Sequence, residues 1–416
     1  MIDALDQDHA KHADLRGGRS PWSKGRQRHL FSGVSENTKC DALIVGGGIT
    51  GSLIAERLTR QGLEVVIIDR ELPGRGSTAA STSMLLWEID RSLTELTQAY
   101  GFERASRAYR ASLAAVRGLT SLTQQLGISC EMRAKDSLYL ATGDTAKDLL
   151  DEHQLRERAG LPGIFLDHRK LLESFGITRA GAIVSPGAAD ADPVQLSRGL
   201  LALAVARGAR IFEDEALEFD VASRAVGVQL KDGHQIEARL VILATGYALP
   251  SIVPSTIQSI SSSWAIATPP QPQNIWKNGA LIWENSDKYL YARTTTAGRI
   301  IIGGEDSEGI IEPASRDRLI EEKASLLARK LTALWPAAND EIEFRWAGTF
   351  DTTSDGLPLI GPVPGMKGVY AAYGYGGNGI TFSFLAAQLI GDLIAGSSRQ
   401  FLADFALDRD GTSNPA

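Results

Sequence analysis

The stretch Asp41-Ala42-Leu43-Ile44-Val45-Gly46-Gly47-Gly48-Ile49-Thr50-Gly51 joins a short apolar run to a cluster of glycines. Its apolar residues 42–45 predict a buried strand, and residues 52–61 have the periodicity of an amphipathic helix. A second apolar run follows at 65–68, and Asp69 closes it. Strand, glycine turn, helix and strand in this order predict a βαβ unit, and therefore an α/β fold.

The glycines Gly46, Gly48 and Gly51 have the spacing of the G-x-G-x-x-G fingerprint of dinucleotide-binding proteins. In that fingerprint the first glycine permits a tight turn, the second lets a pyrophosphate approach the backbone, and the third allows the helix to pack closely on the strand. The start of a helix also offers free N–H groups and a partial positive charge. Asp69 stands at the spacing expected of an acid that binds ribose, so we expect a bound dinucleotide here.

Three later segments indicate a flavin dinucleotide, a choice that the fingerprint alone does not make. Residues 76–83 offer small and hydroxyl side chains directly after the second strand, where a loop can pass close to a ring system and phosphates. The buried run 240–244 ends in Thr245-Gly246, which permits close approach of a nucleotide. Residues 374–381, Gly-Tyr-Gly-Gly-Asn-Gly-Ile-Thr, precede a helix whose positive end would stabilise a reduced, anionic flavin.

Together these motifs resemble the D-amino-acid oxidase family of FAD-dependent oxidoreductases, which includes glycine oxidase, monomeric sarcosine oxidase and gamma-glutamylputrescine oxidoreductase. The resemblance spans roughly residues 40–400, and its carriers are the segments 41–51, 243–246, 298–304, 353–361 and 376–380. It implies a Rossmann-like FAD-binding domain with an interleaved α+β substrate domain built on a large antiparallel sheet.

The resemblance also divides the chain. Residues 40–91, 180–250 and 345–416 are assigned to the FAD-binding domain, and residues 92–179 and 251–344 to the substrate domain. Within the latter, the apolar period of residues 92–127 predicts one long helix. Residues 1–39 show no sustained period and are expected to form an irregular arm, with Trp22 and Leu30-Phe31 as docking points.

By motif position, the resemblance implies which residues hold FAD. Asp69 would bind the adenosine ribose, residues 77–83 would line the phosphates or the ring, and Ala216 would contact adenine through its backbone. The full expected set is Gly46, Gly48, Ile49, Thr50, Gly51, Asp69, Arg70, Gly76, Ser77, Thr78, Ser83, Met84, Ala216, Ala244, Thr245, Gly246, Gly348, Gly377, Asn378, Gly379, Ile380 and Thr381. No cysteine lies near the C-terminal glycines and no histidine lies in 76–84, so we expect non-covalent FAD.

Only one dinucleotide fingerprint is visible, so we expect electrons to come from an organic substrate and not from NAD(P)H. The resemblance implies oxidation of an amine or amino acid by hydride transfer from the alpha carbon to flavin N5, giving an imine that water hydrolyses. Oxygen or another acceptor would then reoxidise the flavin. Two alternatives stay open, namely a dehydrogenase of a hydroxy acid or polyol, and a flavin-containing subunit with structural FAD.

Arg293 is the candidate anchor for a substrate carboxylate. The resemblance places an arginine there, and a guanidinium can donate two parallel hydrogen bonds to a carboxylate. The alternative is a sheet arginine paired with a neighbouring acid. Glu88 and Asp90 either receive a cationic amine or are solvated acids at a helix start. The aromatic residues of this region either wall a substrate pocket or pack within the sheet, and they are Tyr247, Trp264, Trp283, Tyr289 and Tyr291. The candidate catalytic residues are Arg293, Tyr291 and Tyr247.

Composition limits the remaining possibilities. A chain of 416 residues with 43% hydrophobic and 22% charged residues can bury a large core. The net charge of -7, without a long run of either sign, argues against nucleic-acid or membrane-surface binding. Cys40 and Cys130 match no metal or redox spacing, and the six histidines are scattered, so no metal site is expected. Without a signal peptide or a run of roughly 18 apolar residues, we expect no membrane span and a cytoplasmic location.

Overall fold

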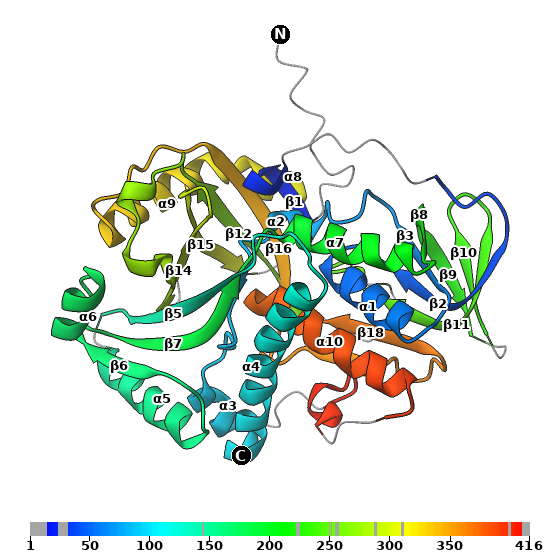
Figure 1. The fold of residues 1–416 in the computed structure, drawn as a ribbon, viewed down its shortest axis with the longest axis horizontal. Helices are drawn as coiled ribbons and strands as arrows, with labels where there is room; N and C mark the ends of the chain where they lie inside the picture. Colours follow the sequence, from blue (N-terminus) through cyan, green and yellow to red (C-terminus); the bar gives the residue numbers. More distant parts are fainter. Residues whose placement is uncertain are drawn as a thin grey trace, which may run out of the picture.

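The computed structural model describes residues 15–23, 32–143, 145–221, 225–248, 250, 252–253, 258–286, 289–308, 312–397 and 401–409. Two sheets organise these residues, one of eight strands and one of ten. The larger sheet occupies the left half of Figure 1 and the smaller one the right half. Leu30 and Phe31, expected as docking points, lie outside the described residues.

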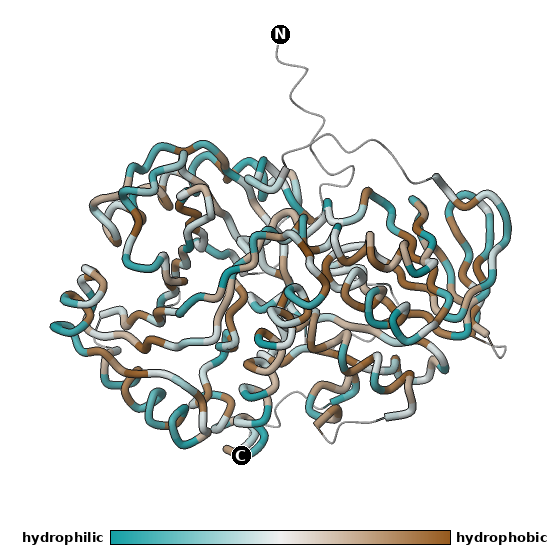
Figure 2. Tube along the Cα trace, in the orientation of Figure 1, coloured by the Kyte–Doolittle hydropathy of each residue, from teal (hydrophilic) through white to brown (hydrophobic). Residues whose placement is uncertain are grey.

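The eight-stranded sheet has a parallel centre in the order β18-β11-β2-β3-β8. Its central strands are buried on both faces, which is why they read as continuous apolar runs. Figure 2 shows hydrophobic residues along this part of the trace. The strands of this sheet are β2 (Thr38–Val45), β3 (Val65–Asp69), β8 (Arg210–Glu213), β9 (Ala216–Asp220), β10 (Val226–Leu230), β11 (Gln235–Leu243), β17 (Leu359–Pro362) and β18 (Val369–Tyr373).

Helix α1 (Ile49–Arg60) packs between α7 (Pro193–Ala206) and α10 (Gly379–Ile394) beside this sheet. Ile44 of β2, Ile67 of β3 and Ile242 of β11 share one hydrophobic core with these helices. Their neighbours along the strands, including Leu43 and Val66, belong to a second core on the other face. The alternation therefore determines on which face of the sheet the helices α1, α7 and α10 pack.

The ten-stranded sheet has the order β1-β16-β12-β15-β14-β13-β5-β7-β4, with β6 also paired to β7. All its pairs are antiparallel except β13 with β5. The strands are β1 (Arg16–Arg19), β4 (Met84–Leu85), β5 (Arg133–Ala141), β6 (Ile164–Asp167), β7 (Gly181–Asp190), β12 (Gln258–Ala267), β13 (Leu281–Asn285), β14 (Leu290–Thr294), β15 (Ile300–Glu308) and β16 (Phe344–Thr353).

Helix α9 (Ile320–Leu334) covers one face of this sheet through contacts with β12, β15 and β16. Helix α9 does not occupy the opposite face of the ten-stranded sheet. The other described helices are α2 (Ser77–Ala80), α3 (Leu93–Tyr100), α4 (Phe102–Gln125), α5 (Ala146–Arg158), α6 (His168–Phe175), α8 (Pro313–Arg318), and the 3-10 turns η1 (Pro21–Ser23), η2 (Pro272–Asn274), η3 (Lys277–Gly279), η4 (Gly376–Asn378) and η5 (Leu402–Phe405).

The course of the chain differs from the expected division at three strands. Strands β4, β7 and β16 were assigned with the FAD-binding segments, but all three lie in the ten-stranded sheet. The reason is their pairing, because β4 pairs with β7, β7 runs along β5, and β16 runs along the whole of β12. The helix expected over 92–127 is also two helices, because Gly101 takes a φ of 78° between α3 and α4.

The N-terminal arm is ordered where the structure describes it. Strand β1 extends the ten-stranded sheet by pairing with β16, so the expectation of an irregular arm is wrong for residues 16–19. Trp22 is buried, and its indole N–H donates to the carbonyl of Ser81 over 2.7 Å. This indole therefore docks as expected, onto the segment that follows α2.

Candidate functional site

A cavity of about 880 Å³ is lined by residues of both sheets, and its size is at the upper end of the range for ligand pockets. At one end it is bounded by the segment 214–219 and by Asp69 and Arg70. It continues along the glycine turn and α2, and reaches an aromatic region under strands β12 to β16. The cavity is therefore built from segments that lie far apart in the sequence.

The three fingerprint glycines have three different environments. Gly46 has a φ of 107°, and a Cβ there would lie 2.3 Å from the carbonyl oxygen of Ala244. A Cβ at Gly51 would lie 1.9 Å from the carbonyl oxygen of Gly46, so this glycine is needed for packing of α1 on β2. A Cβ at Gly48 would meet only the Thr78 hydroxyl, at 3.2 Å, and Gly48 lines the cavity. The second glycine thus leaves space inside the cavity itself.

Polar groups gather around this space. Asp69 accepts hydrogen bonds from the amides of Gly47, over 2.7 Å, and Glu71, over 2.9 Å. Enclosure by protein raises the pKa of its carboxyl to about 6, although these two bonds oppose the shift. The amide of Ile49 at the start of α1 donates to the Thr78 hydroxyl over 2.9 Å. Backbone amides, a hydroxyl and an acid at a helix start suit a pyrophosphate beside a ribose.

The residues expected to hold FAD line this cavity with three exceptions. Gly51 packs against the backbone of Gly46, as described above. Thr381 turns its hydroxyl to the carbonyl of Leu86 over 2.8 Å. Ser83 has a φ of 59° and is buried behind the wall, where its carbonyl accepts from Arg293. The cavity, its room at Gly48 and its donor set fit FAD.

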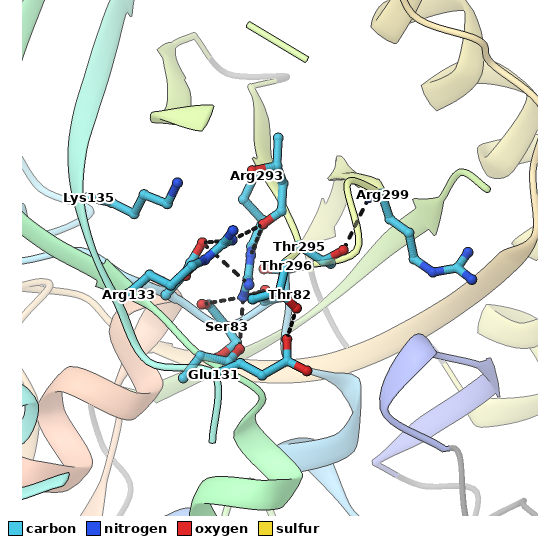
Figure 3. A network of polar contacts seen from close by, with 12 residues as sticks. Thr82, Ser83, Glu131, Arg133, Lys135, Arg293, Thr295, Thr296 and Arg299 are labelled. Atoms are coloured by element: carbon cyan, nitrogen blue, oxygen red, sulfur yellow. Dashed lines mark hydrogen bonds and ion pairs between the residues drawn. The ribbon is translucent and has the colours of Figure 1, made fainter. Parts of the chain in front are cut away.

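Arg293 does not face the cavity. It is 2% exposed, and its Nη1 donates to the carbonyls of Ser83 and Ala191 over 2.8 and 2.9 Å (Figure 3). Its Nη2 lies 3.4 Å from Asp190, and Asp190 also pairs with Arg133. Burial lowers the pKa of Arg293 to about 10, which leaves it cationic at neutral pH. This arrangement contradicts the expectation that Arg293 holds a substrate carboxylate.

Tyr291 and Tyr247, the other expected catalytic residues, line the cavity together with Tyr289, Trp283 and Trp264. Tyr291 lies in β14 and Tyr289 directly precedes this strand, and their rings are in contact with centroids 5.9 Å apart. The Tyr291 hydroxyl lies 3.1 Å from that of Ser263, and the Tyr289 hydroxyl donates to Asp306 over 2.6 Å. An aromatic wall with hydroxyls is therefore present at this end.

Of the two acids expected near an amine, only Asp90 lines the cavity. Its carboxylate accepts from the amide of Gly377 over 2.6 Å. Enclosure by protein raises the pKa of Asp90 to about 6, and the charge of Asp306 adds to the shift. Glu88 is buried elsewhere, where it accepts from Ser137 and lies 3.9 Å from Arg156.

Asp306 is a lining residue that the sequence did not reveal. Simple alternation from Gly303, which pairs with Tyr291, would turn residue 305 to the cavity. A bulge opposite Ser263 and a φ of 60° at Glu305 reverse this. Glu305 therefore turns to the lysines of α9, and Asp306 lines the cavity. Other unexpected lining residues are Asp214, Glu215, Phe219, Trp346, Thr349 and Phe350.

The described residues lack two further features. They contain no helix with the length and apolar character needed to cross a membrane. They also contain no group of three or more His, Cys, Asp or Glu side chains placed to hold a metal ion. Neither cysteine lines the cavity.

Comparison with known proteins gives a consistent result. The model of a family described as FAD dependent oxidoreductase matches residues 41–393. Glycine oxidase of Geobacillus kaustophilus is 27% identical, over 89% of this chain and 97% of that protein. Gamma-glutamylputrescine oxidoreductase of Escherichia coli is 25% identical, over 89% of this chain and 87% of that protein.

Solved structures share the fold. The crystal structure of glycine oxidase from Geobacillus kaustophilus has a TM-score of 0.73 and 23% identity, and the match covers 90% of this chain and 100% of that one. L-proline dehydrogenase from P. horikoshii has a TM-score of 0.74 and 20% identity, covering 89% of this chain and 97% of that one.

Proposed function

Because this chain belongs to the family of FAD-dependent oxidoreductases, we propose that it oxidises an amine or amino acid at the carbon alpha to nitrogen. FAD, when bound, supplies a two-electron acceptor for a hydride leaving that carbon. The substrate becomes an imine, and water converts the imine to a carbonyl compound and an amine or ammonia. The chain's own task is to position the substrate and to exclude competing reactions.

The residues that would hold FAD follow from the cavity. Asp69 would face the adenosine ribose, the space at Gly48 and the Thr78 hydroxyl would receive the pyrophosphate, and the segment 214–219, which lines the cavity, would border the adenine. The turn η4 and the start of α10 would lie toward the flavin ring, where the positive end of a helix stabilises negative charge.

One observation carries the proposal of substrate oxidation, namely that the cavity extends beyond the glycine turns into the region of Tyr247, Tyr289 and Tyr291. In a subunit with purely structural FAD, we would expect side chains to fill this extension of the cavity, because protein interiors are closely packed. The choice of C–N over C–O oxidation is supported by the relatives, two of which are named as acting on an amino acid or an amine.

An anaerobic screen of the FAD-loaded protein tests the proposal. We expect at least one amine or amino acid to bleach the oxidised-flavin absorbance, and we expect matched hydroxy acids to leave it unchanged. Bleaching by hydroxy acids or polyols alone would overturn C–N oxidation. Absence of bleaching by all of these classes, with FAD fully bound, would support the structural subunit.

A further inference from the structure

Resting on the proposed amine oxidation, we propose that the substrate enters as an ammonium cation without a carboxylate on the oxidised carbon, and that Asp90 and Asp306 bind its charge within the aromatic wall. One of these two carboxylates takes the ammonium proton, so that the amine is neutral and has its nitrogen lone pair when the hydride leaves the carbon. This choice narrows the proposed function to one substrate class. It is the opposite of what a carboxylate-binding arginine at position 293 would have selected.

The charge of the cavity is the first support. Asp90 and Asp306 both line its aromatic end. Among the described lining residues the single basic side chain is Arg70, which lies next to Asp69 at the other end. At the aromatic end, Asp90 and Asp306 are therefore two enclosed carboxylates with no basic side chain beside them among the described lining residues. Such a pair attracts a cation and repels a carboxylate, because Coulomb interactions are strong where water is excluded.

The aromatic wall is the second support. The rings of Tyr289 and Tyr291 have centroids 5.9 Å apart and are tilted by 40°, so they form two sides of a corner. Tyr247 and Trp283 line the same region. Ring faces attract ammonium groups through the cation–π interaction, and several rings with carboxylates nearby are a recurrent way of binding organic cations.

A buried carboxylate oxygen is the third support. Tyr289 donates to the Oδ2 atom of Asp306, whereas the buried Oδ1 atom accepts no hydrogen bond of good geometry within the described residues, although the Ser263 hydroxyl lies close enough to lower the pKa of this carboxyl. Buried polar atoms in this state mark the place where a bound molecule completes the hydrogen bonding.

Among the described residues that line the aromatic end of the cavity, in contrast, no basic side chain is present to anchor a substrate carboxylate. The guanidinium of Arg293 is occupied by the carbonyls of Ser83 and Ala191 and by Asp190. Freeing it to bind a substrate would leave these buried acceptors unsatisfied, which is unfavourable.

The test uses the FAD-loaded protein and pairs of compounds that differ only in a carboxylate, namely benzylamine with phenylglycine and cadaverine with lysine, both enantiomers of each amino acid. We expect flavin reduction by the amine of at least one pair to exceed that by its amino acid at least tenfold in rate over Kd. Faster reduction by both amino acids would overturn the inference and leave amine oxidation standing. Absence of reduction by any amine or amino acid would instead overturn the proposed function.

A binding measurement separates recognition from turnover. Benzyltrimethylammonium has no nitrogen lone pair and cannot be oxidised at the carbon alpha to nitrogen, so its binding is read from the perturbed flavin spectrum, with benzoate as the anionic counterpart. We expect the cation to bind more tightly than benzoate, and Asp306→Asn and Asp90→Asn each to weaken the cation at least tenfold. Asp151→Asn, on the exposed face of α5, is the matched control. Equal binding of cation and benzoate, or unchanged binding in both cavity variants, would refute the role of these acids.

Discussion

The guanidinium Nη1 of Arg293 donates to the carbonyl oxygen of Ser83 over 2.8 Å, and Ser83 takes a left-handed φ of 59° at this point. Thr82 and Met84, on either side, line the cavity. Arg293 therefore acts behind the cavity wall, where it fixes the corner between α2 and β4. This hydrogen bond holds Arg293 and Ser83 to each other behind the wall, and neither of them lines the cavity.

Replacing Arg293 tests this placement. Arg293→Met leaves the carbonyls of Thr82, Ser83 and Ala191 without this donor. We expect a loss of about 3–5 kcal/mol of stability and weaker FAD retention. The preference between an amine and its carboxylated analogue should not change, as measured by chemical unfolding and anaerobic flavin reduction. A variant of normal stability that loses only amino-acid oxidation would restore Arg293 as a carboxylate anchor.

The glycines of the fingerprint offer a matched pair of variants. Gly51→Ala places a methyl group 1.9 Å from the Gly46 carbonyl, so we expect destabilisation by at least about 3 kcal/mol even without FAD. Gly48→Ala meets only the Thr78 hydroxyl at 3.2 Å, so the apoprotein should stay within about 1 kcal/mol of the wild type. Its FAD affinity should nevertheless fall about tenfold or more, because the methyl group occupies the space for phosphate.

Unfolding curves of the two apoproteins measure the loss of stability, and FAD titrations measure the loss of affinity. Unaltered FAD binding by Gly48→Ala would place the pyrophosphate elsewhere.

Residues 16–22 of the N-terminal arm hold the loop around α2. Arg16 donates to the carbonyl of Arg75, Ser20 to that of Ala79, and Trp22 to that of Ser81. Since Ser77 and Thr78 of this loop line the cavity, we expect Trp22→Phe to weaken FAD binding several-fold. Phenylalanine keeps an aromatic ring but is smaller than the buried indole, so the variant loses some packing and one buried hydrogen bond, the latter worth about 1 kcal/mol. FAD titration by fluorescence measures the change, with Trp335→Phe, which loses a bond to Asn274 remote from the loop, as control. Equal affinity in both variants would show that the arm does not support the cofactor site.

The C-terminal segment is attached by a buried ion pair. Arg409 donates from Nε and Nη2 to Asp355 over 2.7 and 2.9 Å. Burial alone would raise the pKa of Asp355, but the bonds and charge of Arg409 outweigh it and lower this pKa to about 2, from 3.8. A lowered pKa means that the stabilisation is complete above pH 3.8 and is lost as the pH falls toward 2.

We therefore expect Arg409→Leu to cost about 3–5 kcal/mol at neutral pH. The difference from the wild type in free energy of unfolding should stay constant down to about pH 4 and then shrink by about 2 kcal/mol. Urea unfolding across this pH range provides the measurement. A difference that already shrinks between pH 7 and 5 would assign the pH dependence to another group.

The sequence predicted the βαβ unit and most of the cavity wall because these depend on local signals. Gly46 needs its positive φ, Gly51 needs its missing side chain, and the start of α1 follows the glycines directly. Such constraints act over a few residues and can be read from the chain.

What the sequence did not reveal depends on register and on distant partners. The position of Asp306 in the cavity follows from a bulge in β15, and no residue pattern announces it. Arg293 has the alternation of a cavity residue, but the carbonyls that cover it come from segments more than 100 residues away. The break at Gly101 is the exception, since a glycine within a helical pattern was a visible signal.

The central claim is that the glycine turn and Asp69 hold FAD, and a titration of the purified apoprotein with FAD tests it most directly. We predict uptake of one FAD per chain, with the shifted and structured flavin absorbance of an enclosed ring, and loss of that uptake in Asp69→Ala combined with Gly48→Ala. A folded wild-type protein that takes up no FAD, or a double variant that binds as tightly as the wild type, would contradict the account.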